Sequence, residues 1–452
     1  MAGSIVKFLP GFEGPLPFEL ETGYIGAGES EDVQLFYAFI KSESNPQSDP
    51  LIIWLDGGPG CSSFIPLFFG IGPVVLEPLS FDGALPKLVL NPSTWTKTAQ
   101  ASQSSDLQAS DQAYEFIRKW LHDHPEYKSN PFYVSGISYG GIPVPILTQL
   151  ISNGKIFSMW LFTLGKFFGC VTICPKTYMY FGVIPGIEDG IEPRIDLKGY
   201  ILGNPITKVS GILNYRVPFA YAMGLISDEL YESLKVSCKG EYEITDSSNL
   251  VCSKNMQAYN ELVRNIDDQQ ILIPVCPLLS REPNKLFTGG RSIIQMLYKK
   301  FEELDVRGST PMEWIALVEH WANNKSVQEA LHVRRETIGQ WVSCSDTLPY
   351  TKNAGSVVPY HANLSTTGYR SLIYSGDSVE YFESQAWIRS LHYPIIDDWR
   401  QWIHEGQVAG YTRTYANKMT FATVKGGGHV AYEFKPAECR TMLERWISYQ
   451  PL

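Results

Sequence analysis

The sequence contains no excess of positive charge and no basic stripe. Its 452 residues include 37 lysines and arginines against 47 aspartates and glutamates, which gives a formal net charge of -10 at pH 7. Nucleic acids and anionic membrane surfaces attract proteins through clustered positive charge. The charge balance therefore argues against either of them as the main partner.

The cysteines lack the arrangement of a structural zinc site. None of the eight belongs to a paired C-x-x-C motif, and no histidines lie nearby. We therefore expect no metal ion, and no motif for a cofactor is present. Disulfide bonds in a secretory compartment are the better interpretation. The tripeptides that begin at Asn324 and Asn363 fit N-glycosylation acceptors, which agrees with that compartment. The opening residues, however, lack the apolar core of a signal peptide.

A clean membrane-spanning run is also missing. The apolar segment at residues 155–187 is rich in aromatic residues, but Lys166 splits it and Pro175 ends it. It therefore falls short of the ~20 apolar residues that a span requires. We interpret the segment as an atypical insertion that comes from translated non-coding sequence or a splice variant. The alternative is a functional hairpin or an extension of a lid.

What is present suits a large globular enzyme. Hydrophobic residues make up 44% of the chain, enough to bury a substantial core. Apolar runs predict buried strands at residues 51–55 and 131–136 and before two late polar loops. Amphipathic segments predict helices between these strands, one of them capped near Ser105 or Asp106. Strands that alternate with helices predict a doubly wound α/β sheet with its active site along one edge.

Three residues at strand ends form a candidate catalytic set. The stretch "VSGISYGG" places Ser138 in Gly-x-Ser-x-Gly, the spacing of a nucleophile elbow. Asp377 follows "LIYSG" and His429 lies in "GGGH", which gives the order Ser, Asp, His of an α/β-hydrolase. In such a triad, the histidine takes the serine proton and the carboxylate fixes the imidazole tautomer. Each motif alone also fits an ordinary turn or loop.

A serine nucleophile needs two backbone donors for the developing oxyanion. The elbow turns the N–H of Tyr139 toward the substrate. We expect the second donor to be the N–H of Gly58 in "DGGPG", because glycine lets the backbone approach a substrate closely.

Six ordered motifs resemble those of the serine carboxypeptidase family: "WLDGGPGCSS", "FYVSGISYGG", "GYILGNP", "WANNKSVQEALHV", "LIYSGD" and "VKGGGHVAYEFKP". The opening "FLPGFEGPLPFELETGYIG" resembles the plant acyltransferase-like branch of that family. The resemblance implies an α/β-hydrolase core at residues 1–207 and 331–452, with an inserted helical lid at 208–330. It implies the same triad and oxyanion donors, and a vacuolar or secreted location.

The resemblance also implies two disulfide bonds, Cys61 to Cys344 and Cys238 to Cys252. Cys276 lacks its usual partner, since "TPMEWIALVEHWANN" contains no cysteine.

This chain departs from the family at the residues that bind a substrate carboxylate. Family peptidases read the C-terminal carboxylate of a peptide with an asparagine in the glycine loop and two acidic side chains. This chain has Asp56, Gly70 and Ile137 at these places. An isoleucine cannot hydrogen-bond a substrate acid, so the remaining substrate contact falls to Asp56 and its neighbour Gly57.

The sequence also lacks one of the buried strands that we expect in the centre of the sheet. The segment "NPSTWTKTAQASQSSDLQASDQ" is polar throughout, whereas family members carry an apolar strand after the residue matching Trp95. Losing a central strand removes backbone partners, at a cost above the ~5 to 15 kcal/mol by which a typical domain is stable. Such a deletion threatens folding.

Two classes of function follow. As an enzyme, the chain forms an acyl-enzyme on Ser138 and releases it to water or to an acceptor hydroxyl. The plant branch favours acyl transfer from the glucose ester of an aromatic acid, with a peptide C-terminus as the alternative substrate. In the second class, the chain is a catalytically silent isoform that keeps the triad only as inherited sequence.

Overall fold

The structure is a computed structural model that describes most of the chain. The described residues are 3–28, 30–68, 70–77, 84–95, 98–99, 105–153, 193–243, 248–267, 269–273, 311–334, 339–345 and 348–452. The predicted insertion at 155–187 and Cys276 lie outside these ranges.

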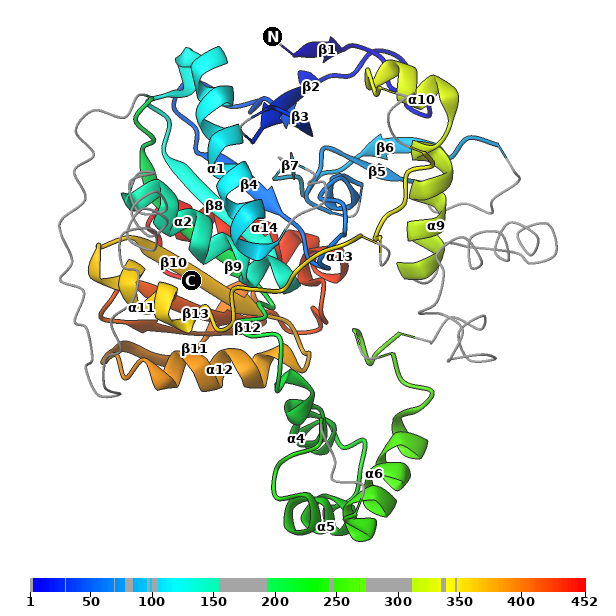
Figure 1. Cartoon of the computed structure of the whole chain (residues 1–452), viewed down its shortest axis with the longest axis vertical. Helices are drawn as coiled ribbons and strands as arrows, with labels where there is room; N and C mark the ends of the chain where they lie inside the picture. The colour runs from blue at the N-terminus through cyan, green and yellow to red at the C-terminus, as the bar shows by residue number, and fades with distance from the viewer. Residues whose placement is uncertain are drawn as a thin grey trace, which may run out of the picture.

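A seven-stranded, mostly parallel sheet forms the centre of the molecule (Figure 1), with the strand order β11-β12-β13-β10-β9-β8-β4. The parallel strands are β4 (Leu51–Leu55), β8 (Phe132–Ile137), β9 (Leu197–Gly203), β10 (Arg370–Ser375) and β13 (Met419–Thr423). The antiparallel strands β12 (Gln407–Tyr415) and β11 (Ile395–His404) complete one side. This arrangement confirms the predicted α/β class.

Helices cover both faces of this sheet, as parallel strands require. Successive strand residues point to opposite faces, so Val134 packs with α1 and α2, whereas Tyr133 packs with α14. The helices around the sheet are α1 (Asp106–Asp123), α2 (Pro143–Asn153), α11 (Val358–Thr366), α12 (Glu380–Ser390), α13 (Ala431–Phe434) and α14 (Pro436–Ile447). The Ser105 side chain caps α1 by accepting a hydrogen bond from the N–H of Gln108, as predicted.

A second sheet lies beside the first. It contains β1 (Ser4–Val6), β2 (Leu20–Ala27), β3 (Val33–Ile40) and the two-residue β7 (Thr98–Ala99). The hairpin of β5 (Val74–Leu76) and β6 (Leu88–Leu90) is separate. Within the described ranges, β4 pairs only with β8. The segment in which the sequence predicts no strand contributes the two-residue β7, which pairs with β3 and lies next to β4 without forming a ladder with it. The sheet position that the sequence predicts to be missing is therefore filled only over these two residues.

A small apolar cavity marks this interruption. It has a volume of about 50 Å³ and lies between Tyr37 and Phe39 of β3, Leu51 and Ile53 of β4, and Phe116 of α1. Packing of side chains, rather than a shared backbone ladder, therefore joins the two sheets over this stretch.

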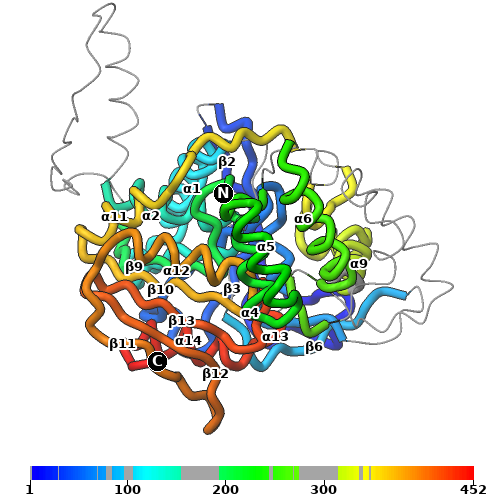
Figure 2. The backbone as a smooth tube through the Cα atoms, turned by 90° about the horizontal axis from the view of Figure 1, so that it is seen from below, coloured from blue at the N-terminus to red at the C-terminus, as the bar shows by residue number. Residues whose placement is uncertain are grey.

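Three helices of the predicted lid have a small core of their own. They are α4 (Arg216–Ala222), α5 (Asp228–Cys238) and α6 (Leu250–Val263), and they project away from the central sheet in Figure 1 and lie in front of it in Figure 2. The disulfide Cys238–Cys252 joins α5 to α6, and Cys61–Cys344 joins the glycine loop to a distant segment. Both predicted disulfides are confirmed.

The remaining helices lie nearer the N-terminal strands. In α9 (Pro311–Ala322), Trp321 packs against Phe64 and Phe68 of the core. It is followed by α10 (Lys325–Ala330). Elsewhere in the described part of the chain, short 3-10 helices form at η1 (Ile65–Leu67), η2 (Pro125–Tyr127), η3 (Ser138–Gly141) and η4 (Ile212–Tyr215). The lid boundaries at 208 and 330 stay a prediction. None of the helices in the described ranges is both long enough and apolar enough to cross a membrane.

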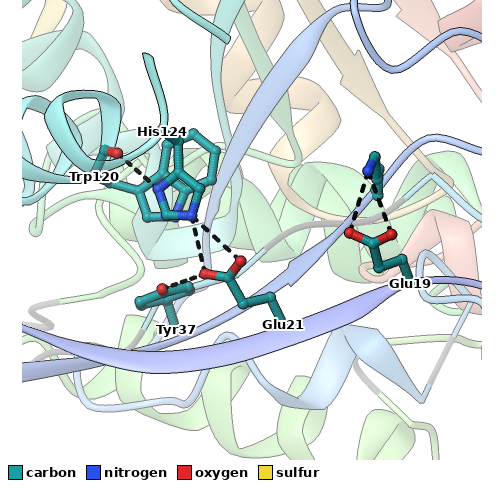
Figure 3. Close-up of polar contacts among 6 residues, drawn as sticks. Glu19, Glu21, Tyr37, Trp120 and His124 are labelled. Carbon is teal, nitrogen blue, oxygen red and sulfur yellow. Dashed lines mark hydrogen bonds and ion pairs between the residues drawn. The ribbon is translucent and has the colours of Figure 1, made fainter. Parts of the chain in front are cut away.

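His124 fastens the end of α1 to the second sheet (Figure 3). Its Nδ1 lies 2.9 Å from the carbonyl oxygen of Trp120, and its Nε2 lies 3.0 Å from Oε1 of Glu21. Because a carbonyl and a carboxylate only accept hydrogen bonds, this geometry favours an imidazole with both nitrogens protonated. The hydroxyl of Tyr37 donates to the same carboxylate oxygen over 2.5 Å, and the Trp120 ring stacks on the imidazole.

Both pKa values move in the direction that favours this ion pair. Burial raises the pKa of Glu21, but hydrogen bonds from His124 and Tyr37 outweigh it, so the pKa lies below its ordinary value. Burial lowers the pKa of His124, but its hydrogen bonds to Glu21 and to the carbonyl of Trp120, together with the charges of Glu21 and Glu126, outweigh it, so this pKa lies above its ordinary value. Both groups are therefore charged between their ordinary pKa values of 4.5 and 6.5.

We expect Glu21→Gln to lower the free energy of unfolding by about 1–3 kcal/mol near pH 5.5, where both partners are charged. The raised pKa of His124 contributes stability below pH 6.5, and this contribution is lost as pH rises through the folded pKa. The lowered pKa of Glu21 contributes above pH 4.5, and this contribution is lost as pH falls through the folded pKa. The effect of the substitution should therefore shrink at pH 8 and at pH 3. Urea unfolding at these three values of pH measures it.

Glu19→Gln is the matched control, because it removes the exposed ion pair of Glu19 with Lys41 at 3.2 Å in the same region (Figure 3). Its expected cost is about 0–1 kcal/mol. A loss for Glu21→Gln that does not change with pH would contradict the charged pair.

Candidate active site

Ser138 occupies a sharp turn between β8 and a helix. It starts η3 directly after Ile137, and its φ is +56°. A positive φ is uncommon for a residue other than glycine, and such strain concentrates at functional sites. The flanking glycines have a steric reason, since a Cβ on Gly136 or Gly140 would lie 2.5 or 2.7 Å from the carbonyl oxygen of Leu55. The Gly-x-Ser-x-Gly motif thus forms the predicted elbow against the end of β4.

The glycine loop after β4 passes directly over this serine. A Cβ on Gly57 would lie 3.1 Å from the Oγ of Ser138 and 3.3 Å from the backbone nitrogen of Tyr139. A hydrogen bond of 2.9 Å from the N–H of Asp56 to the Oγ of Ser63 holds the start of the loop. The structure therefore brings Asp56, Gly57 and the elbow together. Gly58 follows in the same loop with a φ of +112°.

Asn204 joins the loops that carry the other two predicted residues. It follows β9 and is fully buried. Its Oδ1 accepts hydrogen bonds from the N–H of Gly376 at 3.2 Å and the hydroxyl of Ser378 at 2.9 Å. Its Nδ2 donates to the carbonyl oxygens of Gly428 at 3.1 Å and His429 at 2.5 Å. The loops after β10 and β13 are thereby fixed next to each other.

The elbow at Ser138 is hydrogen-bonded to the segment that follows β9. The N–H of Ile206 donates to the carbonyl oxygen of Ser138 over 2.9 Å, two residues beyond Asn204. Sequence reasoning missed Asn204, although an asparagine directly after a buried strand in "GYILGNP" was a signal for it.

The two carboxylates near His429 differ in what they contact. The Asp377 carboxylate accepts a hydrogen bond from the N–H of Gly426, in the loop that leads to His429. The Nδ1 of His429 lies 3.2 Å from Oε1 of Glu380, and each of these two side chains is only 15% exposed. Glu380 is the first residue of α12 and was not among the residues selected from the sequence. Its position three residues after Asp377 was the available signal.

Burial gives the site carboxyls different pKa values. Burial raises the pKa of Glu380, but the charge of His429 and hydrogen bonds such as that with Ser378 outweigh it and lower the pKa to about 2. Burial raises the pKa of Glu383, one turn further along α12, to about 7 despite hydrogen bonds from Thr207. Burial raises the pKa of Asp56 to about 7, although the N–H of Gly57 and the charge of His429 oppose it. The site therefore keeps Glu380 ionised while Asp56 and Glu383 are neutral below about pH 7.

The segment that follows α6 contacts the loop between Gly426 and His429. The N–H of His429 donates to the carbonyl oxygen of Gln269 over 2.6 Å, and the Nε2 of Gln270 donates to the carbonyl oxygen of Gly426 over 2.9 Å. The backbone of His429 is thus held by Asn204 on its carbonyl side and by the lid region on its N–H side.

The remaining sequence-selected residues lie around this site or at the surface. Ile137 is 2% exposed and packs in the cluster that contains Trp54, so it fills space beside the serine. Asn363 is exposed on α11, whereas half-buried Asn324 caps α10 through its side chain. Glycosylation of either residue stays a prediction.

Comparisons with known proteins agree with this architecture. The family model for serine carboxypeptidase matches residues 10–159 and 182–449, and the unmatched stretch falls within the predicted insertion. Serine carboxypeptidase-like 10 of Arabidopsis thaliana is 47% identical over 472 residues, covering 100% of this chain and 95% of the relative. Serine carboxypeptidase-like 2 of the same plant is 46% identical over 473 residues, covering 100% of this chain and 94% of the relative.

The fold is similar to that of a solved structure. A prohormone-processing carboxypeptidase from Saccharomyces cerevisiae superposes with a TM-score of 0.68 at 17% identity, covering 99% of this chain and 96% of that one. At this identity the likeness speaks for the α/β-hydrolase fold. From the family model and the relatives together, the chain belongs to the serine carboxypeptidase family.

Proposed function

We propose that the chain transfers acyl groups through an acyl-enzyme on Ser138. The observation that carries this proposal is the strained serine, with its φ of +56°, packed under the glycine loop and beside the loops that Asn204 joins. The family membership supports a hydrolase-type mechanism.

In this mechanism, the Oγ of Ser138 attacks the carbonyl carbon of an ester while His429 takes the hydroxyl proton. The tetrahedral intermediate places its negative oxygen against the N–H groups of Tyr139 and Gly58. When it collapses, the bond to the leaving group breaks and His429 returns the proton to that group. Water or an acceptor hydroxyl then attacks the acyl-enzyme, with His429 again taking the proton. Asp377 holds the histidine loop through Gly426.

The acyl donor that we propose is the glucose ester of an aromatic acid, with an acceptor hydroxyl as the second substrate. Two observations support an ester over a peptide. The opening segment resembles the acyltransferase-like branch and lies within the stretch that the plant relatives match, and Ile137 occupies the place beside the serine where a peptidase clamp needs an acid. The two disulfides are consistent with a vacuolar or secreted location, which we also propose.

Removal of peptide C-terminal residues is the second candidate function, and Asp56 favours it. With a pKa raised to about 7 by burial, Asp56 is protonated at acidic pH. A protonated carboxyl can donate a hydrogen bond to the free carboxylate of a peptide, whereas an ionised one repels it.

Labelling by a fluorophosphonate probe tests the nucleophile. We expect labelling of the folded protein that disappears in Ser138→Ala and slows by about 10²-fold or more in His429→Gln, because the base is lost. Mass spectrometry of the labelled peptide measures it. Ser233→Ala, on exposed α5, is the control that should label normally. Folded protein that takes up no label would favour the silent isoform instead.

Product analysis separates the two enzymatic functions. With an acylglucose and an acceptor alcohol, we expect the acyl ester of the acceptor as the main product, and slower release of amino acid from a blocked dipeptide. Liquid chromatography with mass spectrometry measures both in the same preparation, with Ser138→Ala as the blank. Dipeptide cleavage without any transfer product would make the chain a peptidase.

The pH dependence of peptide cleavage tests Asp56. Because its pKa is raised to about 7, any cleavage of a blocked dipeptide should fall as pH rises through about 7, mainly through a higher KM. Asp56→Asn keeps a hydrogen-bond donor that cannot ionise, so its KM should stay flat between about pH 6 and 8. An equal rise of KM in both proteins would remove Asp56 from carboxylate binding.

A further inference from the structure

We propose that Gln270 couples the lid region to the active site, as a positioning residue that holds the backbone of the loop between Gly426 and His429. The inference rests on the proposed function, because it assigns a support to the histidine of that mechanism. It adds a residue from the lid region to a site that the core strands otherwise build.

The side-chain amide of Gln270 is buried and hydrogen-bonded at both ends. The residue is only 2% exposed. Its Nε2 donates to the carbonyl oxygen of Gly426 over 2.9 Å, and its Oε1 accepts the N–H of Leu272 over 3.3 Å. A flipped amide would place donor against donor and acceptor against acceptor, so these contacts fix its orientation. The donor end of Gln270 is therefore directed at the loop.

A compact turn after α6 holds Gln270 in this position. The Oδ1 of Asp267 accepts hydrogen bonds from the N–H groups of Gln269 at 2.9 Å and Gln270 at 3.0 Å. The N–H of Ile273 donates to the carbonyl oxygen of Gln270 over 3.1 Å. We call these four residues the lid turn. Because an aspartate that bonds the backbone two residues on stabilises a turn locally, the lid turn presents its glutamine in a fixed direction.

The loop has the shape that the lid turn requires. Gly428 has a φ of +56°, and a Cβ there would lie 2.6 Å from the carbonyl oxygen of Gln269 and 3.0 Å from side-chain atoms of Gln270. Glycine permits both this conformation and this close approach. The N–H of His429 donates to the same carbonyl oxygen of Gln269 over 2.6 Å. The lid turn thus contacts the loop at Gly426, Gly428 and His429.

Contacts from the core and from the lid turn meet at Gly426. Its N–H donates to the carboxylate of Asp377, and its carbonyl oxygen accepts from Gln270. The elbow that carries Ser138 belongs to β8 and has no part in these contacts. Loss of the Gln270 donor therefore frees the histidine loop to shift relative to the serine. A shift of about 1 Å between reacting groups can cost about 10²-fold in rate.

Charged groups lie around the contact, but the contact itself needs none of them. Lys425 and Lys435 act on Asp377 from the loop side, and Asp267 acts on Glu433, whose pKa burial raises to about 8. The amide of Gln270 is neutral at every ordinary pH. A glutamate at this position would instead titrate, which provides a test.

Replacement of the amide by an apolar side chain tests the coupling. In Gln270→Leu, we expect the rate constant of fluorophosphonate labelling at saturating probe to fall by about tenfold, with an unchanged half-saturating concentration, because the loop shifts while the substrate contacts stay. A partly unfolded population would lower the amount of labelled protein instead of the rate constant. Gln257→Leu, at an exposed position of α6, is the matched control and should label at the wild-type rate. A fall of less than about threefold in Gln270→Leu would overturn the proposal, and any larger fall supports it.

Gln270→Glu adds a rescue that depends on pH. A protonated carboxyl can donate to the carbonyl oxygen of Gly426, whereas an ionised one cannot. Burial raises the pKa of a carboxyl, so labelling relative to wild type at the same pH should be nearly normal at about pH 5 and fall by about fivefold or more at about pH 8. Gln257→Glu should show a constant ratio. A constant ratio in Gln270→Glu would overturn the proposal, and this variant decides the question if Gln270→Leu does not fold.

Hydrogen exchange separates this proposal from the proposed function. In the Ser138→Ala background, amides of the peptide that contains Gly426 and His429 should exchange about tenfold faster when Gln270→Leu is added, and at the same rate when Gln257→Leu is added. Mass spectrometry measures the exchange without any catalysis. Faster exchange would support the coupling even if wild-type protein takes up no probe, a result that would count against the proposed function alone. Unchanged exchange with Gln270→Leu would overturn the coupling.

Discussion

The buried amide of Asn204 is the interaction on which the site depends. Adjacent parallel strands place the residues after β8, β9 and β10 at one edge of the sheet, but parallel pairing alone does not fix the loops that follow. Asn204 supplies four hydrogen bonds to the loops after β10 and β13 without burying a charge. The amide of Asn204 is uncharged and has two donors and two accepting lone pairs. It can therefore hydrogen-bond both loops at a lower desolvation cost than a charged side chain would.

The site also shows how one helix keeps two carboxyls in different states. Glu380 and Glu383 are three residues apart on α12, yet one faces an imidazole and the other a threonine. The histidine lowers the pKa of the first to about 2, and burial raises the pKa of the second to about 7 despite hydrogen bonds from Thr207 and the charge of Lys208. The buried charge is thus restricted to the position that has a counter-charge, as desolvation energetics require.

Features that depend on neighbours in the sequence could be predicted, and features that depend on distant loops could not. The elbow at Ser138, the buried strands and the cap at Ser105 follow from short patterns, and the structure has them all. The disulfides came from family resemblance. By contrast, Asn204 meets the histidine loop across 225 residues, and Glu380 reaches His429 only because α12 starts at that edge. No local periodicity encodes such meetings, so the sequence could not reveal the contact between Glu380 and His429.

The interruption between β3 and β4 has a consequence for how the molecule opens. Within the described ranges, the N-terminal strands contact the central sheet through side-chain packing around a small apolar cavity, and the pair of His124 and Glu21 joins them to helix α1. Without a continuous ladder, little backbone cooperativity crosses this boundary. We therefore expect the amides of the N-terminal sheet to exchange with solvent through a subglobal opening that leaves the elbow and strands β8, β9 and β10 intact.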